Sequence, residues 1–206
     1  MNFSEIKPNI YAYLGYHGCV VDERTDEMID ECLRELETVI CFKHTHALFT
    51  EGFHDFLRHE PYKSFLSNCN GYALCVMTLG SEVDRYISRL SVTDMAKAVV
   101  ADSCASAVLE KLSDEREDEL FGKDRTYRFC PGYGGSKVED VREIFKAVNP
   151  KIGVSISGGG LMVPQKSMAG IVGLGKTAKR SCGECGLKEH CRYRQEGVRC
   201  YGSENK

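Results

Sequence analysis

Four cysteines close to the C-terminal end of the chain form the clearest group of residues capable of chemistry. Cys182, Cys185, Cys191 and Cys200 follow one another with the spacing C-x2-C-x5-C-x8-C. Two thiolates separated by two residues can hold one metal, and two later thiolates complete a tetrahedral set. Zinc and a 4Fe–4S cluster both accept four thiolates, so the spacing predicts a site for one of the two.

An iron–sulfur cluster is the favoured ligand of these cysteines, and zinc is the alternative. The interval between Cys185 and Cys191 is shorter than that in common zinc ribbons, and the C-x2-C-x5-C part resembles segments that ligate auxiliary 4Fe–4S clusters. A tail with reducible thiols and no ligand is the simpler interpretation, but four cysteines so spaced indicate a ligand role. Nearby arginines can offset thiolate charge: Arg192, Arg194 and Arg199.

The sequence RFCPGYGG, residues 128–135, is a second group that could hold a ligand. Proline fixes φ and lacks an N–H, while glycine accepts positive φ and lets a ligand approach the backbone closely. The run therefore predicts a tight, rigid loop that follows an exposed arginine, Arg128. Packing within the loop is the simpler role for Tyr133.

Two histidines and a run of glycines are weaker candidates. His44 and His46 lie on one side of an expected strand, an arrangement that can bind a metal. No third ligand lies near them in the sequence, so we expect ordinary polar surface there. The glycines at 158–160 could form an anion nest. Because their spacing does not match a P-loop, a tight turn between two strands is the better prediction.

Helices and short strands must position these residues. Apolar side chains at three- and four-residue intervals predict helices over 22–42, 81–90, 94–120 and 138–148. Ser136 and Glu139 form an S-x-x-E capping pattern for the last of these. The charged stretch after Leu112 is expected to be the solvated end of the third helix. Short apolar runs bounded by turn residues predict strands over 45–49, 71–80, 151–157, 161–163 and 169–175.

These elements favour a mixed α+β domain. Strands and helices do not alternate regularly enough for a doubly wound sheet, and the last three strands follow one another with short connections. We expect a mostly antiparallel, twisted sheet packed with helices over residues 1–175. From about residue 176 the composition becomes basic and cysteine-rich. We assign residues 176–206 to a metal- or cluster-binding tail, because about thirty residues cannot bury a core of their own.

Composition and charge exclude several classes of partner. The 206 residues are 42% hydrophobic, enough for a core, and a net charge of −3 provides no general attraction to nucleic acid or anionic membranes. No segment approaches the ~20 apolar residues that cross a bilayer, so we expect a cytoplasmic protein with neither nucleic acid nor membrane as partner. The odd total of eleven cysteines indicates free thiols in a reducing cell. Four are expected to be small buried hydrophobes: Cys32, Cys69, Cys75 and Cys104.

The loop resembles a known motif. RFCPGYG is similar to the R-x-x-P-G-Y motif of the reactivation domain of cobalamin-dependent methionine synthase, the domain that binds S-adenosylmethionine. Other segments resemble short stand-alone members of that superfamily and appear in the same order, so the resemblance covers residues 11–175. These segments are YLGY (13–16), TLGSEVDRYI (78–87), DMAKAVVADSCASAVLE (94–110) and IGVSISGGGLMVPQKSMAGIVGL (152–174). The resemblance implies an activation-domain-like fold.

The resemblance also implies a set of residues that bind S-adenosylmethionine. Arg128 would meet the carboxylate of the ligand, which a guanidinium fork matches bidentately. Cys130 and Gly132 would offer main-chain contacts, and Tyr133 would pack beside the ligand. Glu110 would receive the amino group, although an ordinary surface carboxylate is an equally good interpretation of Glu110.

The function implied is that of an accessory protein in the reductive reactivation of a corrinoid-dependent methyltransferase of the methionine synthase type, within methionine biosynthesis. The protein would dock over the cobalamin of its partner and present S-adenosylmethionine. A 4Fe–4S cluster in the tail would supply an electron. The chain would be part of a methyltransferase reactivation system, because modules for homocysteine, folate and cobalamin are lacking.

An alternative function is a non-catalytic adaptor. The long methionine synthases continue beyond the segment equivalent to SMAGIVGL with further chain that contacts the ligand, and here the cysteine-rich tail stands in its place. A zinc-stapled tail would then dock the protein onto a corrinoid protein, with an eroded nucleotide pocket. S-Adenosylmethionine binding and the identity of the metal separate the two functions.

Overall fold

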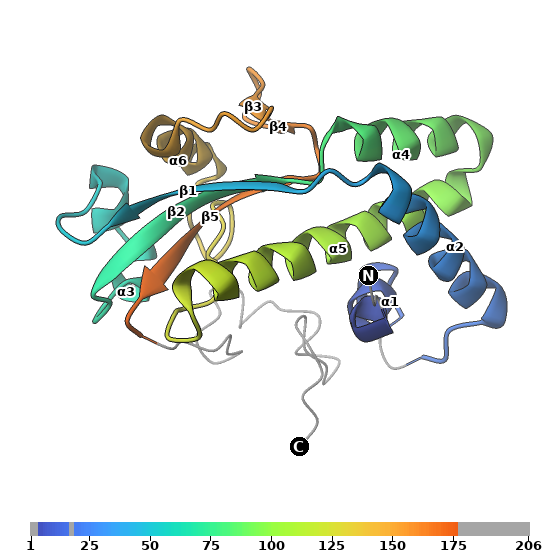
Figure 1. Cartoon of the computed structure of the whole chain (residues 1–206), viewed down its shortest axis with the longest axis horizontal. Coiled ribbons are helices and arrows are strands. Elements are labelled where there is room, and N and C mark those ends of the chain that lie inside the picture. The colour runs from blue at the N-terminus through green and yellow to red at the C-terminus, as the bar shows by residue number, and fades with distance from the viewer. Residues whose placement is uncertain (1–3, 17–18, 177–206) are drawn as a thin grey trace.

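A long helix, α5 (Met95–Phe121), lies along one face of a three-stranded antiparallel sheet and organises the chain (Figure 1). The computed structural model describes residues 4–16 and 19–176. The four cysteines predicted to bind a metal or cluster, and the tail that contains them, lie outside the described residues. The strand order is β1 (Lys43–Phe49), β2 (Gly71–Thr78) and β5 (Ser167–Leu174).

The central strand β2 divides the core into two parts. Its residues alternate between the faces of the sheet, as the two-residue period of a strand requires. Ala73, Cys75 and Met77 face α5 and belong to one buried cluster. Leu74 and Val76 face the opposite side and pack under α6 (Val141–Val148), which covers that face in Figure 1. A sheet covered on both faces explains why β2 is an almost uninterrupted run of apolar residues.

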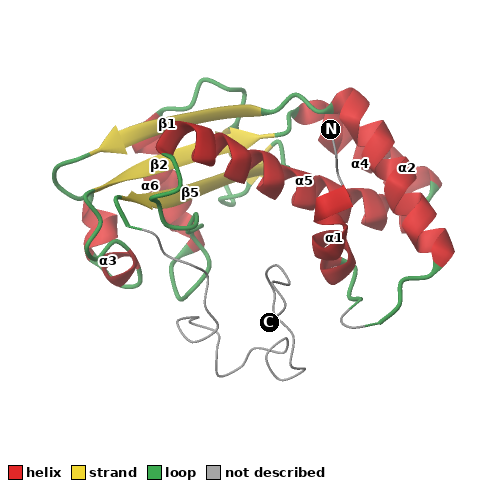
Figure 2. Ribbon diagram, turned by 60° about the horizontal axis from the view of Figure 1, so that its bottom comes forward, coloured by secondary structure: helices red, strands yellow, loops and turns green. Residues whose placement is uncertain are grey.

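Three further helices pack against α5. They are α1 (Lys7–Tyr13), α2 (Glu23–Val39) and α4 (Ser81–Thr93), and Figure 2 shows them gathered at one end of α5. Small residues such as Ala101 and Ala105 are fully buried in α5, and they allow neighbouring helices to approach closely. Asp94 begins α5 by accepting a hydrogen bond from the backbone N–H of Lys97 at 3.0 Å. The other half of α5 is left to lie along the sheet.

Short elements complete the described chain. They are η1 (Ser4–Ile6), η2 (Asp55–Arg58), α3 (Tyr62–Phe65), η3 (Val138–Asp140), β3 (Ser155–Ile156) and β4 (Met162–Val163). β3 and β4 form a separate antiparallel hairpin. The backbone N–H of Gly160 donates to Ser157 O at 3.0 Å within its turn, which confirms the turn predicted for the glycine run at 158–160.

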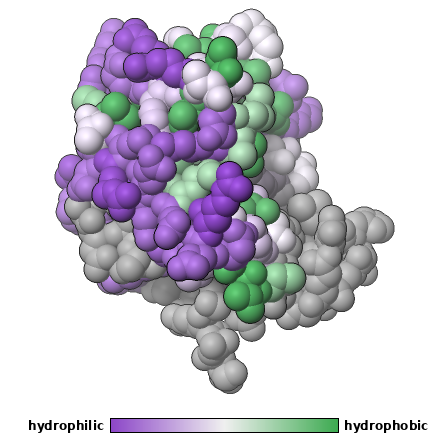
Figure 3. Space-filling view, turned by 90° about the vertical axis from the view of Figure 1, so that its right-hand side faces the viewer, coloured by the Kyte–Doolittle hydropathy of each residue, from purple (hydrophilic) through white to green (hydrophobic). Residues whose placement is uncertain are grey.

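The predicted α+β class and the antiparallel sheet are confirmed. Helices occur at each predicted location, and strands occur at each of the five predicted locations. The sequence did not predict how the last three strands pair. In the structure only β5 joins the main sheet, where it pairs with β2. No helix among the described residues combines the length and the apolar character needed to cross a membrane. The surface at the α2 and α4 end is mostly hydrophilic, with small separate hydrophobic patches (Figure 3).

Candidate functional site

The segment 125–129 returns from the end of α5 and runs alongside β5. Arg125 pairs with Leu174 and Phe129 pairs with Ile171 in two isolated antiparallel bridges. The chain takes four steps from 125 to 129 while β5 takes three steps from 174 to 171, so this segment contains one extra residue, as in a β-bulge. The extra residue changes the alternation of side chains. As a result, both Arg125 and Arg128 reach α5, although three positions separate them.

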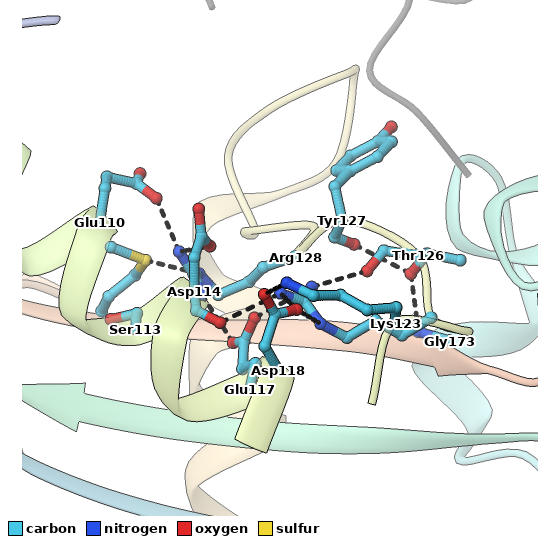
Figure 4. Close-up of polar contacts among 12 residues, drawn as sticks. Glu110, Ser113, Asp114, Glu117, Asp118, Lys123, Thr126, Tyr127, Arg128 and Gly173 are labelled. Atoms are coloured by element: carbon cyan, nitrogen blue, oxygen red, sulfur yellow. Dashed lines mark hydrogen bonds and ion pairs between the residues drawn. The ribbon is translucent and has the colours of Figure 1, made fainter. Parts of the chain in front are cut away.

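Arg128 is buried under α5 and bound by carboxylates of this chain (Figure 4). Its Nη1 donates to Glu117 Oε1 at 2.6 Å. Its Nη2 donates to Glu110 Oε2 at 2.6 Å and to Asp114 Oδ1 at 3.1 Å, and its Nε faces the sulfur of Met168. Only 3% of the residue is exposed. The expectation of an exposed arginine is therefore wrong.

The three carboxylates come from a single stripe of α5. Glu110, Asp114 and Glu117 are spaced by four and three residues, and side chains with that spacing lie on one face of a helix. The side chain of Glu117 is 0% exposed, that of Glu110 is 31% exposed and that of Asp114 is 56% exposed. The guanidinium is thus anchored at its buried end by Glu117 and meets replaceable, solvent-facing partners at the other end.

Gly170 on β5 makes room for the stem of Arg128. A Cβ at this position would lie 2.4 Å from Arg128 Cγ and 2.9 Å from Arg128 Cδ, closer than carbon atoms can approach. Any side chain at 170 would therefore displace the arginine. A glycine inside a strand often marks a close approach of this kind, and that was the available signal in the sequence.

Burial and neighbouring charges set the pKa values of Arg128 and Glu117. Burial alone lowers the pKa of the Arg128 guanidinium, but Glu117, Glu110 and Asp114 outweigh it, so the net shift is upward. Burial raises the pKa of Glu117, and Arg128 and Arg125 oppose this shift. The close Arg128–Glu117 contact at 2.6 Å keeps the two groups charged as a pair, because an unpaired charge at this depth would be costly.

The loop that follows Arg128 has the rigid backbone that its composition predicts. Gly132, Gly134 and Gly135 adopt φ values of 93°, 59° and 86°, a region that favours glycine. Ser136 Oγ accepts a hydrogen bond from the Gly132 N–H at 3.0 Å and donates one to Tyr133 O at 2.7 Å. The capping role predicted for Ser136 is wrong, because its hydroxyl closes the loop and η3 has no side-chain cap.

Tyr133 projects outward from this loop. It is 68% exposed, so the simpler role of packing within the loop does not describe it. In the sequence, Cys130 and Gly132 lie between the buried Arg128 and Tyr133. Of the residues expected to bind a ligand, the structure brings Arg128 and Glu110 into direct contact and places Cys130, Gly132 and Tyr133 on the adjoining loop.

Four residues of the site were missed in the sequence: Asp114, Glu117, Met168 and Gly170. The charged stretch after Leu112 was expected to be solvated, and Glu117 within it is fully buried instead. The three- and four-residue spacing of the acidic residues was the signal that could have identified a common partner. The spacing alone does not show whether this face of α5 is covered by other residues. The residue that covers it, Arg128, lies eleven positions after Glu117, beyond the end of the helix.

Comparisons with known proteins show a likeness to solved structures. No family model matches the chain, and no curated protein sequence matches it. A solved structure, the MetH reactivation domain bound to AdoHcy, resembles it with a TM-score of 0.52 and 15% sequence identity. The likeness covers 86% of this chain and 73% of that chain. The chain therefore has the fold of that reactivation domain.

Proposed function

We propose that this chain binds S-adenosylmethionine beside loop 128–135 and serves as an accessory protein in the reductive reactivation of a corrinoid-dependent methyltransferase of the methionine synthase type. The observation that carries the proposal is the fold, which is shared with a domain crystallised with AdoHcy. The sequence places R-x-x-P-G-Y at the loop, and in the structure the arginine of that motif meets Glu110 next to it. Both charges of an amino-acid group could be met here.

The residues at this place suit an amino-acid ligand in a specific way. Glu110 is partly exposed, so its carboxylate can accept hydrogen bonds from an ammonium group. Asp114 is the most exposed of the three partners of Arg128 and holds it at the longest distance, 3.1 Å. Asp114 can leave Arg128 Nη2 without burying its own charge. Arg128 would then offer that N–H to the carboxylate of the ligand, while Glu117 keeps the guanidinium in place.

The loop would serve the nucleoside part of the ligand. The exposed ring of Tyr133 offers an apolar face, and the glycines let a ligand approach the backbone around Cys130 and Gly132. S-Adenosylmethionine supplies a methyl group for the cobalamin of the partner, and this chain would orient it and exclude water. Cys182, Cys185, Cys191 and Cys200 would hold a 4Fe–4S cluster that supplies the electron.

Calorimetric titration with S-adenosylmethionine and with AdoHcy tests the site. We expect Glu110→Gln to weaken binding about tenfold or more, because a charge-assisted hydrogen bond is lost. We expect Asp114→Asn to leave binding unchanged or to strengthen it, because the competitor for Arg128 Nη2 loses its charge. Glu115→Gln is the matched control, since Glu115 is an α5 carboxylate whose partner is Lys111. Absence of heat with the wild-type chain, or equal affinity in Glu110→Gln, overturns the proposal.

A second candidate function is the adaptor with an eroded pocket. The specific observation in its favour is that Arg128 already uses four N–H contacts on Glu110, Asp114, Glu117 and Met168. An adaptor would take up zinc in the tail and would retain binding to a corrinoid protein without any response to S-adenosylmethionine. Metal analysis of anaerobically purified protein together with the same titration separates the two functions.

A further inference from the structure

Three metal-ligating side chains meet between the sheet and α5. A ring nitrogen of His44 on β1, the sulfur of Cys75 on β2 and a carboxylate oxygen of Glu117 on α5 all lie within 4.8 Å of one another. The sheet register explains part of this meeting. His44 and His46 stand opposite Met77 and Cys75 on the face that α5 covers. Glu117 reaches the same place from the stripe that binds Arg128.

Two polar atoms in this cluster are buried without a hydrogen-bond partner among the described residues. They are His44 Nε2 and Glu117 Oε2. Arg125 Nη1 lies 3.4 Å from Glu117 Oε2, which is an ion pair and not a hydrogen bond. A buried polar group without a hydrogen-bond partner destabilises the fold, so these two atoms are candidates to bind a ligand.

We propose that His44, Cys75 and Glu117 form a buried site for a divalent metal ion, with Zn²⁺ as the best match. Imidazole nitrogen, thiolate sulfur and carboxylate oxygen are the three donor types that zinc takes in proteins. Zinc bonds of about 2.0 to 2.3 Å place neighbouring donors roughly 3.5 Å apart. A contraction of about 1 Å, within reach of side-chain rotation, closes the cluster. A water molecule would complete a tetrahedral shell.

The local charge permits a cation. Four carboxylates and three cationic groups form the surrounding network, which leaves a net charge of −1: Glu110, Asp114, Glu117 and Asp118 against Lys123, Arg125 and Arg128. Metal binding adds two positive charges and converts the Cys75 thiol to a thiolate, with release of one proton to solvent. The network then becomes neutral. The two arginines near Glu117 are therefore compatible with a bound dication.

The protonation states and the access route also fit. Burial, with the nearby His46, Arg116 and Arg128, lowers the pKa of His44 to about 4, so the ring is neutral at physiological pH. Burial raises the pKa of the Cys75 thiol, so a metal must displace its proton and the affinity must rise with pH. β1 is the edge strand of the sheet and His44 is only partly buried, which gives a metal a path from that edge.

The sequence alone does not reveal this site. His44 and His46 were expected to be polar surface for lack of a third ligand, and Cys75 was expected to be a buried hydrophobe. The structure brings Cys75 and Glu117 to His44 from 31 and 73 positions further along the chain. The proposal does not depend on the S-adenosylmethionine site, although Glu117 belongs to both: Oε1 holds Arg128 while Oε2 is the unsatisfied atom.

Cobalt titration of the full-length chain tests the site. The cysteines of the tail are first replaced so that they cannot bind metal: Cys182→Ser, Cys185→Ser, Cys191→Ser and Cys200→Ser. After metal removal with a chelator, we expect one equivalent of Co²⁺ to give a thiolate-to-cobalt charge-transfer band and tetrahedral d–d bands. Zn²⁺ should displace the cobalt. Absence of a saturable charge-transfer band in this chain overturns the proposal.

Single substitutions in the same chain assign the ligands. Cys75→Ala should abolish the charge-transfer band, and His44→Gln should weaken cobalt binding at least tenfold. His46→Gln and Cys104→Ala are the matched controls, since His46 lies beside His44 but packs edge-to-face against Phe121, and Cys104 is buried elsewhere in α5. A charge-transfer band that survives Cys75→Ala assigns the metal to another cysteine and overturns the proposal.

Proton release by the chain whose four tail cysteines are replaced provides a readout that needs no substitution of His44, Cys75 or Glu117. Zinc titrations in two buffers of different ionisation enthalpy should report about one proton released per metal near neutral pH, because the thiol must ionise. If the ligand variants fail to fold, the cobalt charge-transfer band of the chain without tail cysteines still tests the proposal. Release of no proton shows that Cys75 is not a ligand, and the proposal fails.

Discussion

Glu117 belongs to both the candidate ligand site and the candidate metal site. One oxygen of its fully buried carboxylate anchors Arg128, the other has no hydrogen-bond partner among the described residues, and the carboxylate lies within 4.8 Å of ligand atoms of His44 and Cys75. A lone buried carboxylate would be neutral, because burial raises its pKa. The arginines supplied by the bulged segment 125–129 allow it to stay charged. The candidate ligand site and the candidate metal site are therefore two sides of one ion-pair network.

Removing the arginine should expose how much the fold depends on this pair. We predict that Arg128→Met lowers the free energy of unfolding by about 3–5 kcal/mol, because Glu117 loses its closest partner while remaining buried. Denaturant unfolding measures the change. Arg85→Met is the control, since Arg85 pairs with Glu82 on the surface and should cost about 1 kcal/mol or less. The double variant Arg128→Met, Glu117→Gln should recover part of the loss, and an additive result would contradict the pairing argument.

The residues of the site were accessible to sequence reasoning to different degrees. Arg128, Glu110 and the glycine loop could be proposed because their spacing resembles a known motif. Glu117 could not, because it lies in a strongly charged run of a kind that is usually solvated. Whether a charge in such a run is buried depends on the chain that packs over it, and the packing of segment 125–129 is not encoded in the spacing of the run.

At the scale of elements, the contact between segment 125–129 and β5 positions the site. Gly170 is the point of closest approach, where a Cβ would lie 2.4 Å from the Arg128 stem. We predict that Gly170→Ala destabilises the fold by at least about 1–3 kcal/mol, because the added methyl overpacks a buried pair. It should also weaken S-adenosylmethionine binding by moving Arg128.

Thermal unfolding and the calorimetric titration check this prediction. Gly158→Ala is the matched control, because nothing lies within 4 Å of a Cβ at that position and its φ is not positive. It should unfold like the wild-type chain. Equal unfolding temperatures for Gly170→Ala and Gly158→Ala would mean that Arg128 does not pack tightly against β5.

The link between α1 and α2 should respond to pH. Tyr11 Oη donates to Asp26 Oδ1 at 2.5 Å and Lys7 Nζ lies 3.0 Å from Oδ2, and these contacts lower the pKa of Asp26 below 3.8. The folded chain therefore binds this proton less readily than the unfolded chain. The stabilisation is complete above the ordinary pKa and is lost as the pH falls through the lowered one.

Tyr11→Phe tests that link with a conservative change. We predict that it lowers the free energy of unfolding by about 1 kcal/mol or less at pH 7, because Asp26 is partly exposed. The difference from the wild-type chain should shrink at an acid pH below the lowered pKa of Asp26, where the carboxyl is protonated in both states. Urea unfolding at the two pH values measures it. A difference that is the same at both would show that the hydrogen bond does not depend on the carboxylate charge.

The elements themselves were largely predictable, and their pairing was not. The three- and four-residue period located α2, α4, α5 and α6, since each buries one stripe or more of apolar side chains. Strand order is decided by contacts between distant residues. β5 pairs with β2, almost a hundred positions earlier, and bypasses the hairpin β3–β4 that immediately precedes it. No local pattern distinguishes these arrangements.

At the scale of the whole molecule, the described residues, here called the body, bury an extensive hydrophobic core. The two buried clusters are built from residues between Ile6 and Val172, on the two faces of the sheet. We predict that the body folds and binds S-adenosylmethionine whether or not the cysteines beyond residue 176 hold a cluster.

This separation predicts a specific result for the full-length chain purified without oxygen. The wild-type chain should contain about four iron and four sulfide per chain and show visible absorption that bleaches on reduction. The variant Cys182→Ser, Cys185→Ser should lose the iron, because two of four thiolates are removed, yet keep the unfolding temperature and S-adenosylmethionine affinity of the wild-type chain. Stoichiometric zinc in place of iron would favour the adaptor. A fall in S-adenosylmethionine affinity would contradict the predicted independence of body and tail, which is argued from the contacts that Arg128 and the loop make with residues 110–170 of the described chain.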